Sequence, residues 1–123
     1  MPLSLDRIRE IVLSTLGPQD RESCAVYLGD AVFERGETVR IDETETSIPW
    51  RARLAFIDLE PMANWGHSCR YLLINDESGE LRSIDARFPP SQHGEPSTLR
   101  LLWKAQAVPS WTVLSDEPTA LDQ

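Results

Sequence analysis

The sequence predicts an α+β fold, in which an N-terminal amphipathic helix precedes a mostly antiparallel meander of five or six strands, a short second helix and a final strand. Three observations lead to this prediction. Apolar residues near the N-terminus recur at helical spacing. The middle of the chain instead consists of short apolar segments between turn-forming residues. The chain has 123 residues, which is the length of a single domain.

The first predicted element is a helix between Ser4 and the Gly17-Pro18 pair. Ser4 is a suitable N-cap, and Asp6 in the first turn interacts favourably with the positive end of the helix dipole. Glycine followed by proline cannot continue the helix and therefore predicts its end. The apolar residues form one stripe at helical spacing, made of Leu5, Ile8, Ile11, Val12 and Leu16. We expect this stripe to pack on the sheet.

Short extended segments follow a polar turn at residues 17–23. The stretch 42–47 contains no apolar residue, so we expect an exposed edge or loop there. In the predicted strand 51–60 the residues from 54 to 59 are almost continuously apolar, and 70–74 is strongly apolar, which is typical of central strands buried on both faces. Residues 76–79 (Asp-Glu-Ser-Gly) predict a hairpin turn. The predicted strands cover residues 24–28, 31–33, 38–41, 51–60, 70–74 and 81–88.

Residues 98–105 fit two interpretations. Their alternating apolar residues are compatible with a strand, but Leu, Lys, Ala and Gln are good helix formers, and we predict a short helix. A final strand is expected at residues 111–114. The predicted domain therefore spans residues 1–114, and the acidic segment 115–123 is expected to be a disordered tail.

The charge balance bears on the possible partners. The chain has 20 acidic and 12 basic residues, for a net charge of −8, and this field opposes binding to nucleic acid. It contains no apolar run of the ~18 residues that a membrane span requires, and its start lacks the pattern of a signal peptide. We therefore expect a cytoplasmic protein with reduced cysteines. All basic residues except Lys104 are arginines, which suits carboxylate pairing but also reflects genome composition.

The loop between the two central strands is the most suggestive segment for function. It contains Met62, Trp65 and His67 ahead of Cys69. Trp and Met are enriched at protein interfaces, and loops held by a rigid scaffold often carry function. The alternative is that Trp65 folds back to cap the sheet edge, with Cys69 as a small core residue.

We interpret the protein as a non-catalytic protein-interaction module without a cofactor, whose partner has a basic surface. Excess acidic charge suits docking to such a partner. In size, charge and element order the chain is similar to secretion chaperones and toxin-immunity proteins, which implies an accessory, chaperone-like or inhibitor role. The predicted partner-binding residues are Met62, Trp65 and His67 in the loop, Glu43 and Glu45, and Trp50 beside Pro49. The oligomeric state stays open.

A site built from cysteine and histidine is the alternative interpretation. Residues i and i+2 of a strand point the same way, so Cys69 can serve as a nucleophile with His67 as its base. A zinc site would need Cys24, His67, Cys69 and His93 to converge, because zinc takes four such ligands. The chain has neither the CxxC spacing of zinc sites nor the glycine-rich motifs of nucleotide enzymes. For these reasons an enzyme is the less favoured interpretation.

Overall fold

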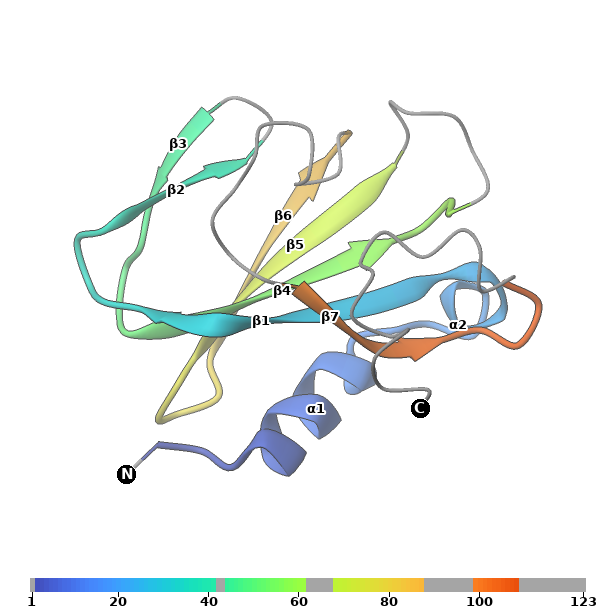
Figure 1. Ribbon diagram of the computed structural model, residues 1–123, viewed down its shortest axis with the longest axis horizontal. Coiled ribbons are helices and arrows are strands. Elements are labelled where there is room, and N and C mark those ends of the chain that lie inside the picture. The colour runs from blue at the N-terminus through green and yellow to red at the C-terminus, as the bar shows by residue number, and fades with distance from the viewer. Residues whose placement is uncertain (1, 42–43, 62–67, 88–98, 109–123) are drawn as a thin grey trace.

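A computed structural model of the chain describes residues 2–41, 44–61, 68–87 and 99–108. It is built around a five-stranded antiparallel sheet of order β6-β5-β4-β1-β7, and β2 and β3 form a second, two-stranded sheet (Figure 1). The predicted α+β class is confirmed. The elements are α1 (Leu5–Ser14), α2 (Asp20–Ser23), β1 (Ala25–Phe33), β2 (Thr38–Ile41), β3 (Thr44–Ser47), β4 (Ala52–Asp58), β5 (Cys69–Asn75), β6 (Leu81–Ala86) and β7 (Leu99–Lys104).

Helix α1 begins where the sequence predicts and ends earlier. The Ser4 hydroxyl accepts a hydrogen bond from the backbone N–H of Arg7 at 3.1 Å, as expected of an N-cap. At the other end, the hydroxyls of Ser14 and Thr15 donate to backbone carbonyls three residues earlier, at 2.6 and 2.7 Å. Such hydroxyls compete with the helical hydrogen bonds, so the helix ends at Ser14 rather than at the Gly17-Pro18 pair.

Strand β1 is continuous across the Gly29-Asp30 pair, where the sequence suggests a break. The pairing of β1 with β4 shifts register between Leu28 and Val32, which is the signature of a β-bulge. The bulge accommodates the glycine without ending the strand. Because the β2–β3 hairpin lies between β1 and β4 in the chain, the sheet is not a simple meander.

The predicted helix over residues 98–105 is wrong, because this segment forms the edge strand β7. It pairs antiparallel with β1, from Ala25 opposite Lys104 to Gly29 opposite Leu99. A helix of two turns would leave most of its backbone groups without intrahelical partners, whereas pairing with β1 satisfies them along one side of the strand. The predicted strand at 111–114 and the tail lie outside the described residues.

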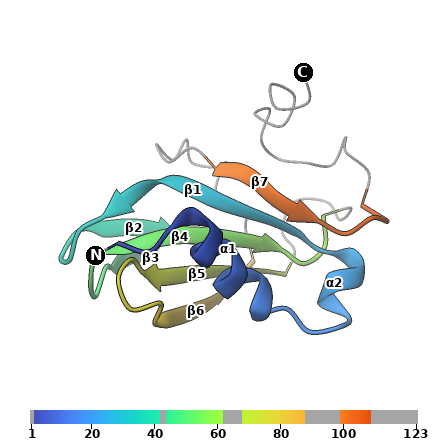
Figure 2. The ribbon, with the colours of Figure 1, turned by 90° about the horizontal axis from the view of Figure 1, so that it is seen from below.

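The two faces of the large sheet are covered by different layers, and each layer has its own core. On one face α1 packs against the sheet through most of the predicted stripe, although Leu5 is exposed, and on the other the β2–β3 hairpin covers it (Figure 2). The first group, which we call the helix-side core, includes Ile8, Val12, Leu16, Val26, Ile57, Leu72 and Ile74. The second, the hairpin-side core, includes Tyr27, Val39, Ile41, Ile48, Phe56, Tyr71 and Leu73. Both central strands are therefore buried on both faces, as predicted.

The hairpin turn between β5 and β6 is also confirmed. The side-chain oxygen of Asn75 accepts hydrogen bonds from the backbone N–H groups of Glu77 and Ser78, at 2.9 and 3.0 Å. Gly79 has a φ of +82°, which favours glycine. A Cβ atom at this position would also lie 3.0 Å from the Cδ1 atom of Ile11, so the turn is in close contact with α1.

The predicted edge or loop at residues 42–47 is partly described. Residues 44–47 form β3, whose side chains are mostly exposed, and residues 42–43 lie outside the described part of the chain.

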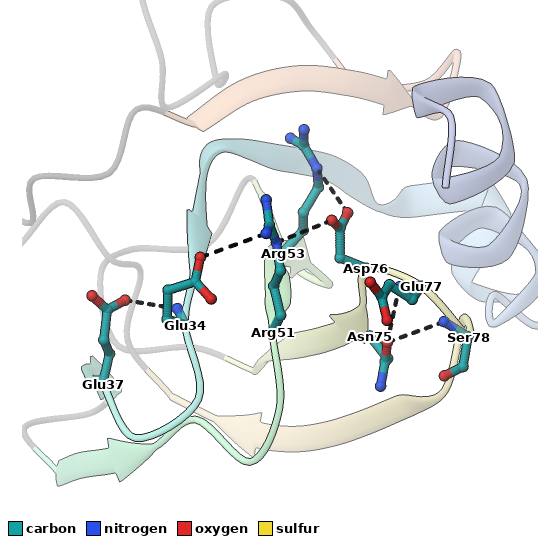
Figure 3. Close-up of polar contacts among 8 residues, drawn as sticks. All are labelled: Glu34, Glu37, Arg51, Arg53, Asn75, Asp76, Glu77 and Ser78. Carbon is teal, nitrogen blue, oxygen red and sulfur yellow. Dashed lines mark hydrogen bonds and ion pairs between the residues drawn. The ribbon is translucent and has the colours of Figure 1, made fainter. Parts of the chain in front are cut away.

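A buried carboxylate organises the end of the sheet near the N-terminus (Figure 3). Asp76 is 2% exposed, and its side chain lies 3.4 Å from the Nε of Arg51 and 3.8 Å from the Nε of Arg53. Its backbone N–H donates to the carbonyl of Arg51, and its carbonyl accepts from the N–H of Leu3 at 2.7 Å. One residue thus connects the segment before α1, the start of β4 and the β5–β6 turn.

We predict that Asp76→Ala lowers the free energy of unfolding by about 2 kcal/mol or more, because it leaves two arginines without their buried partner. Urea denaturation followed by circular dichroism measures this change. The matched control is Glu77→Ala, which removes an exposed carboxylate from the same turn and should cost less than about 0.5 kcal/mol. Equal effects of the two substitutions would contradict the role given to Asp76.

Candidate functional site

The predicted functional loop emerges from one end of the large sheet, which we call the loop end. Here the last residue of β4, Asp58, lies opposite the first residues of β1 and β5, Ala25 and Cys69. Ala25 also lies opposite Lys104, at the end of β7. Helix α2 lies at this end as well (Figure 1). Segments far apart in the sequence therefore meet where the loop begins and ends.

Two carboxylates hold the base of the loop. Asp58 is 1% exposed, and its Oδ1 accepts a hydrogen bond from the backbone N–H of Glu60 at 3.1 Å. The Oε1 of Glu60 accepts from the backbone N–H of Ser68 at 3.4 Å, across the base of the loop. Side-chain hydrogen bonds thus fix the chain where it leaves β4 and where it enters β5. A loop between two such fixed points is presented by a rigid scaffold.

The structure describes only some of the predicted partner-binding residues. Met62, Trp65 and His67, together with Glu43, lie outside the described residues. Their role in partner binding stays a prediction.

The other two predicted partner-binding residues differ in exposure. Glu45 is exposed on β3, opposite Arg40 of β2. Trp50 is half-buried and packs against the hairpin-side core, so at least part of its ring serves the fold.

An apolar pocket with an acidic rim lies beside the base of the loop, and we call it the acidic-rim pocket. Its volume is about 300 Å³. Glu22 and Glu60 are both exposed at this pocket. Its walls come from three separate segments and comprise Ser23, Leu59, Pro61, Ala107 and Val108. Glu22 and Glu60 are far apart in the sequence and meet only in the folded chain, so the sequence does not identify them as a pair.

Hydrogen bonds fix the segments that form this pocket. The N–H of Ala105 donates to the carbonyl of Cys24 at 2.9 Å, and the N–H of Val108 donates to the carbonyl of Ala105 at 3.0 Å. The Nζ of Lys104 donates to the carbonyl of Val108 at 2.7 Å. The first bond attaches the segment after β7 to the segment before β1, and the other two fix the turn at residues 104–108. The pocket is therefore part of the folded framework.

Arg70 holds α2 against the sheet at the same end. It comes from β5, and its guanidinium lies 3.9 Å from Asp20 of α2 and 3.6 Å from Asp85 of β6. The position of Glu22, two residues after Asp20, is thereby linked to the sheet.

The two cysteines lie on opposite faces of the large sheet. Cys24 belongs to the helix-side core and Cys69 to the hairpin-side core, and both are buried and form no disulfide. One zinc ion held by both is incompatible with this arrangement. Within the described residues there is no group of three or more His, Cys, Asp or Glu side chains placed to hold a metal ion. His67 and His93 lie outside those residues.

Cys69 nevertheless borders a second depression at the loop end. This space of about 520 Å³ is lined by Leu59, Ser68, Cys69, Arg70, Asp85, Ala86 and Arg87. Cys69 itself is only 2% exposed and packs with the core. The packing matches the behaviour of a small hydrophobic residue.

Comparisons of the chain with protein-family models, curated proteins and solved structures find no match. Neither helix in the described part of the chain is long and apolar enough to cross a membrane.

Burial predicts a pH dependence at Cys24. Burial, with a smaller contribution from the Asp20 carboxylate, raises the pKa of the Cys24 thiol from 9.0 to about 11. The unfolded thiol therefore ionises first, and stability is lost as the pH rises from about 9 to about 11. We expect the free energy of unfolding to fall over this range by about 2 kcal/mol more in the wild type than in Cys24→Ala. Parallel urea titrations at each pH measure the difference, and identical pH profiles would contradict it.

The packing of Cys69 gives a second prediction. Cys69→Ser places a hydroxyl in the hairpin-side core and should lower the free energy of unfolding by about 1–3 kcal/mol. Cys69→Ala is the control, because it removes volume without adding a polar group, and it should cost less than the serine variant. Unchanged stability of Cys69→Ser would favour the nucleophile interpretation over the core interpretation.

Proposed function

We propose that the protein is a non-catalytic protein-binding module that holds a partner with a basic surface at the loop end of the sheet. The observation that carries this proposal is the acidic-rim pocket at the base of the loop with Met62 and Trp65. An apolar cavity with Glu22 and Glu60 at its rim suits one kind of side chain in particular. Lysine and arginine bury an apolar stem while their charged heads stay at the surface, beside carboxylates.

The surroundings of the pocket support the same partner chemistry. The net charge of −8 favours the approach of a basic protein. Aromatic and methionine side chains supply the apolar contact area of many interfaces, and the sequence of the loop contains both types. Asp58 and Glu60 bind backbone groups that shape the loop base, so these carboxylates act in presenting the loop.

Glu45 adds a second acidic contact in this proposal. It is exposed on β3 of the hairpin that covers the sheet. Rim charges of this kind mainly accelerate association and set its salt dependence. Loss of Glu45 should therefore weaken capture less than loss of the pocket.

Quantitative affinity capture from the native host tests the proposal. Tagged wild-type protein is compared with Glu22→Arg, which places a positive charge at the pocket, and with Trp65→Ala. Glu77→Arg is the matched control, because it reverses an exposed glutamate in the turn at the opposite end of the sheet. We expect one protein to be retained by the wild type and the control, and to decrease about tenfold with Glu22→Arg, a loss of about 1.4 kcal/mol.

Native mass spectrometry of the captured material then gives the stoichiometry of the complex. Circular dichroism of each variant confirms that it is folded. If every captured protein is retained equally by Glu22→Arg and Trp65→Ala, the assignment of the binding site is wrong.

A further inference from the structure

A larger pocket lies at the other end of the molecule, between α1 and the large sheet, and we call it the arginine pocket. Its volume is about 620 Å³, within the roughly 300–1,000 Å³ of pockets that hold small organic ligands. Figure 2 shows α1 lying across the face of the sheet that forms its floor. The pocket is lined by Leu5, Asp6 and Arg9 of α1, Leu28 and Gly29 of β1, Arg53 of β4, and Arg100, Leu101 and Leu102 of β7.

The charge of this pocket is opposite to that of the whole protein. Three arginines and one aspartate line it, and with the Asp76 carboxylate beside Arg53 the local charge is +1, whereas the chain carries −8. The arginines come from α1, β4 and β7, and only folding brings them to one cavity. Concentrating positive charge in a concave site focuses the field on an anion.

Arg53 is held in place before any ligand arrives. Its side chain is 20% exposed, and its Nε lies 3.8 Å from Asp76, which is too far for a hydrogen bond. Within the described part of the chain, this buried Nε has no hydrogen-bond partner. The NH1 group donates a long bond of 3.4 Å to the carbonyl of Gly29. Figure 3 shows the terminal nitrogens of Arg53 turned away from Asp76. Asp76 and the carbonyl of Gly29 thus orient the guanidinium, but most of its hydrogen-bonding capacity is unused.

The remaining walls of the pocket are apolar. Leu5, on α1, is 58% exposed, which is unusual for a leucine in a helix that packs on a sheet. Leu28 and Leu102, which pack with the helix-side core, complete the apolar lining. A ligand that filled the pocket would therefore contact hydrocarbon as well as guanidinium groups.

We propose that the arginine pocket binds an organic carboxylate whose remaining part is apolar. The planar fork of arginine matches a carboxylate, and a charge-assisted hydrogen bond of this kind is stronger than a neutral one. The leucines bury the apolar part of the same ligand. Inorganic anions would meet the guanidinium groups but leave the apolar walls uncovered. This inference is independent of the protein-binding proposal, because the two pockets share no residue.

Isothermal titration calorimetry of the full chain with three probes tests the proposal. Octanoate has both a carboxylate and an apolar chain. Octanamide has the apolar chain without the charge, and inorganic phosphate has the charge without the chain. We expect octanoate to bind at least about tenfold more tightly than either of the others, which is a difference of 1.4 kcal/mol or more. Equal affinity for octanamide would reduce the site to an apolar patch, and equal affinity for phosphate would reduce it to a general anion site. Either result, or no binding of octanoate, would overturn the proposal.

Variants locate the binding in the pocket. Arg9→Gln and Arg100→Gln alter exposed arginines and should each weaken octanoate binding by about five- to tenfold. Arg82→Gln is the matched control, because Arg82 is an exposed arginine on the edge strand β6, outside the pocket. This variant should bind octanoate with the affinity of the wild type. Thermal unfolding of each variant shows whether the fold is intact. Octanoate binding that is insensitive to Arg9 and Arg100 would place the ligand elsewhere.

Discussion

The burial of β4 and β5 on both faces is the constraint on which the rest of this structure depends. Five of the seven residues in each strand are apolar, and consecutive positions of both strands are buried, so a sheet with one solvated face is excluded. The chain meets this requirement with two different covers. An amphipathic helix made before the sheet covers one face, and a hairpin inserted between β1 and β4 covers the other. The arginine pocket lies at the margin of the first cover, where residues of α1 meet β1, β4 and β7.

Aromatic packing shows how the hairpin side of the sheet is filled. Tyr27, Phe56 and Tyr71 lie on three adjacent strands, with ring centroids 5.8 and 5.1 Å apart. These distances fall in the range in which tilted aromatic rings attract one another. The row links β1, β4 and β5 across the centre of the sheet. The ends of the strands are left to polar interactions, namely Asp58 and Glu60 at the loop end and Asp76 with its arginines at the other.

Local sequence signals predicted the parts of the fold that local physics determines. The cap at Ser4, the helical stripe and the turn at Asn75–Gly79 depend on residues within a few positions of one another. The residue types of β7 favour a helix, and for this reason the sequence predicts one there. The segment becomes a strand because it pairs with the edge of β1, which is distant in the chain. The same reasoning applies to the pockets. Glu22 with Glu60, and Arg9 with Arg53 and Arg100, have no spacing that marks them as partners.

The contacts of the N-terminal segment have a consequence for the order of folding. Leu3 is hydrogen-bonded to Asp76, and Ile11 lies against the turn at Gly79. Helix α1 therefore packs against residues that are synthesised much later than the helix itself. A helix of this length is marginal alone, and the surface that its apolar stripe covers is complete only when β5 and the β5–β6 turn have left the ribosome. Docking of the helix therefore belongs to the late, non-local steps that slow folding. Until then the apolar residues of this segment stay uncovered, and exposed apolar segments are what chaperones bind.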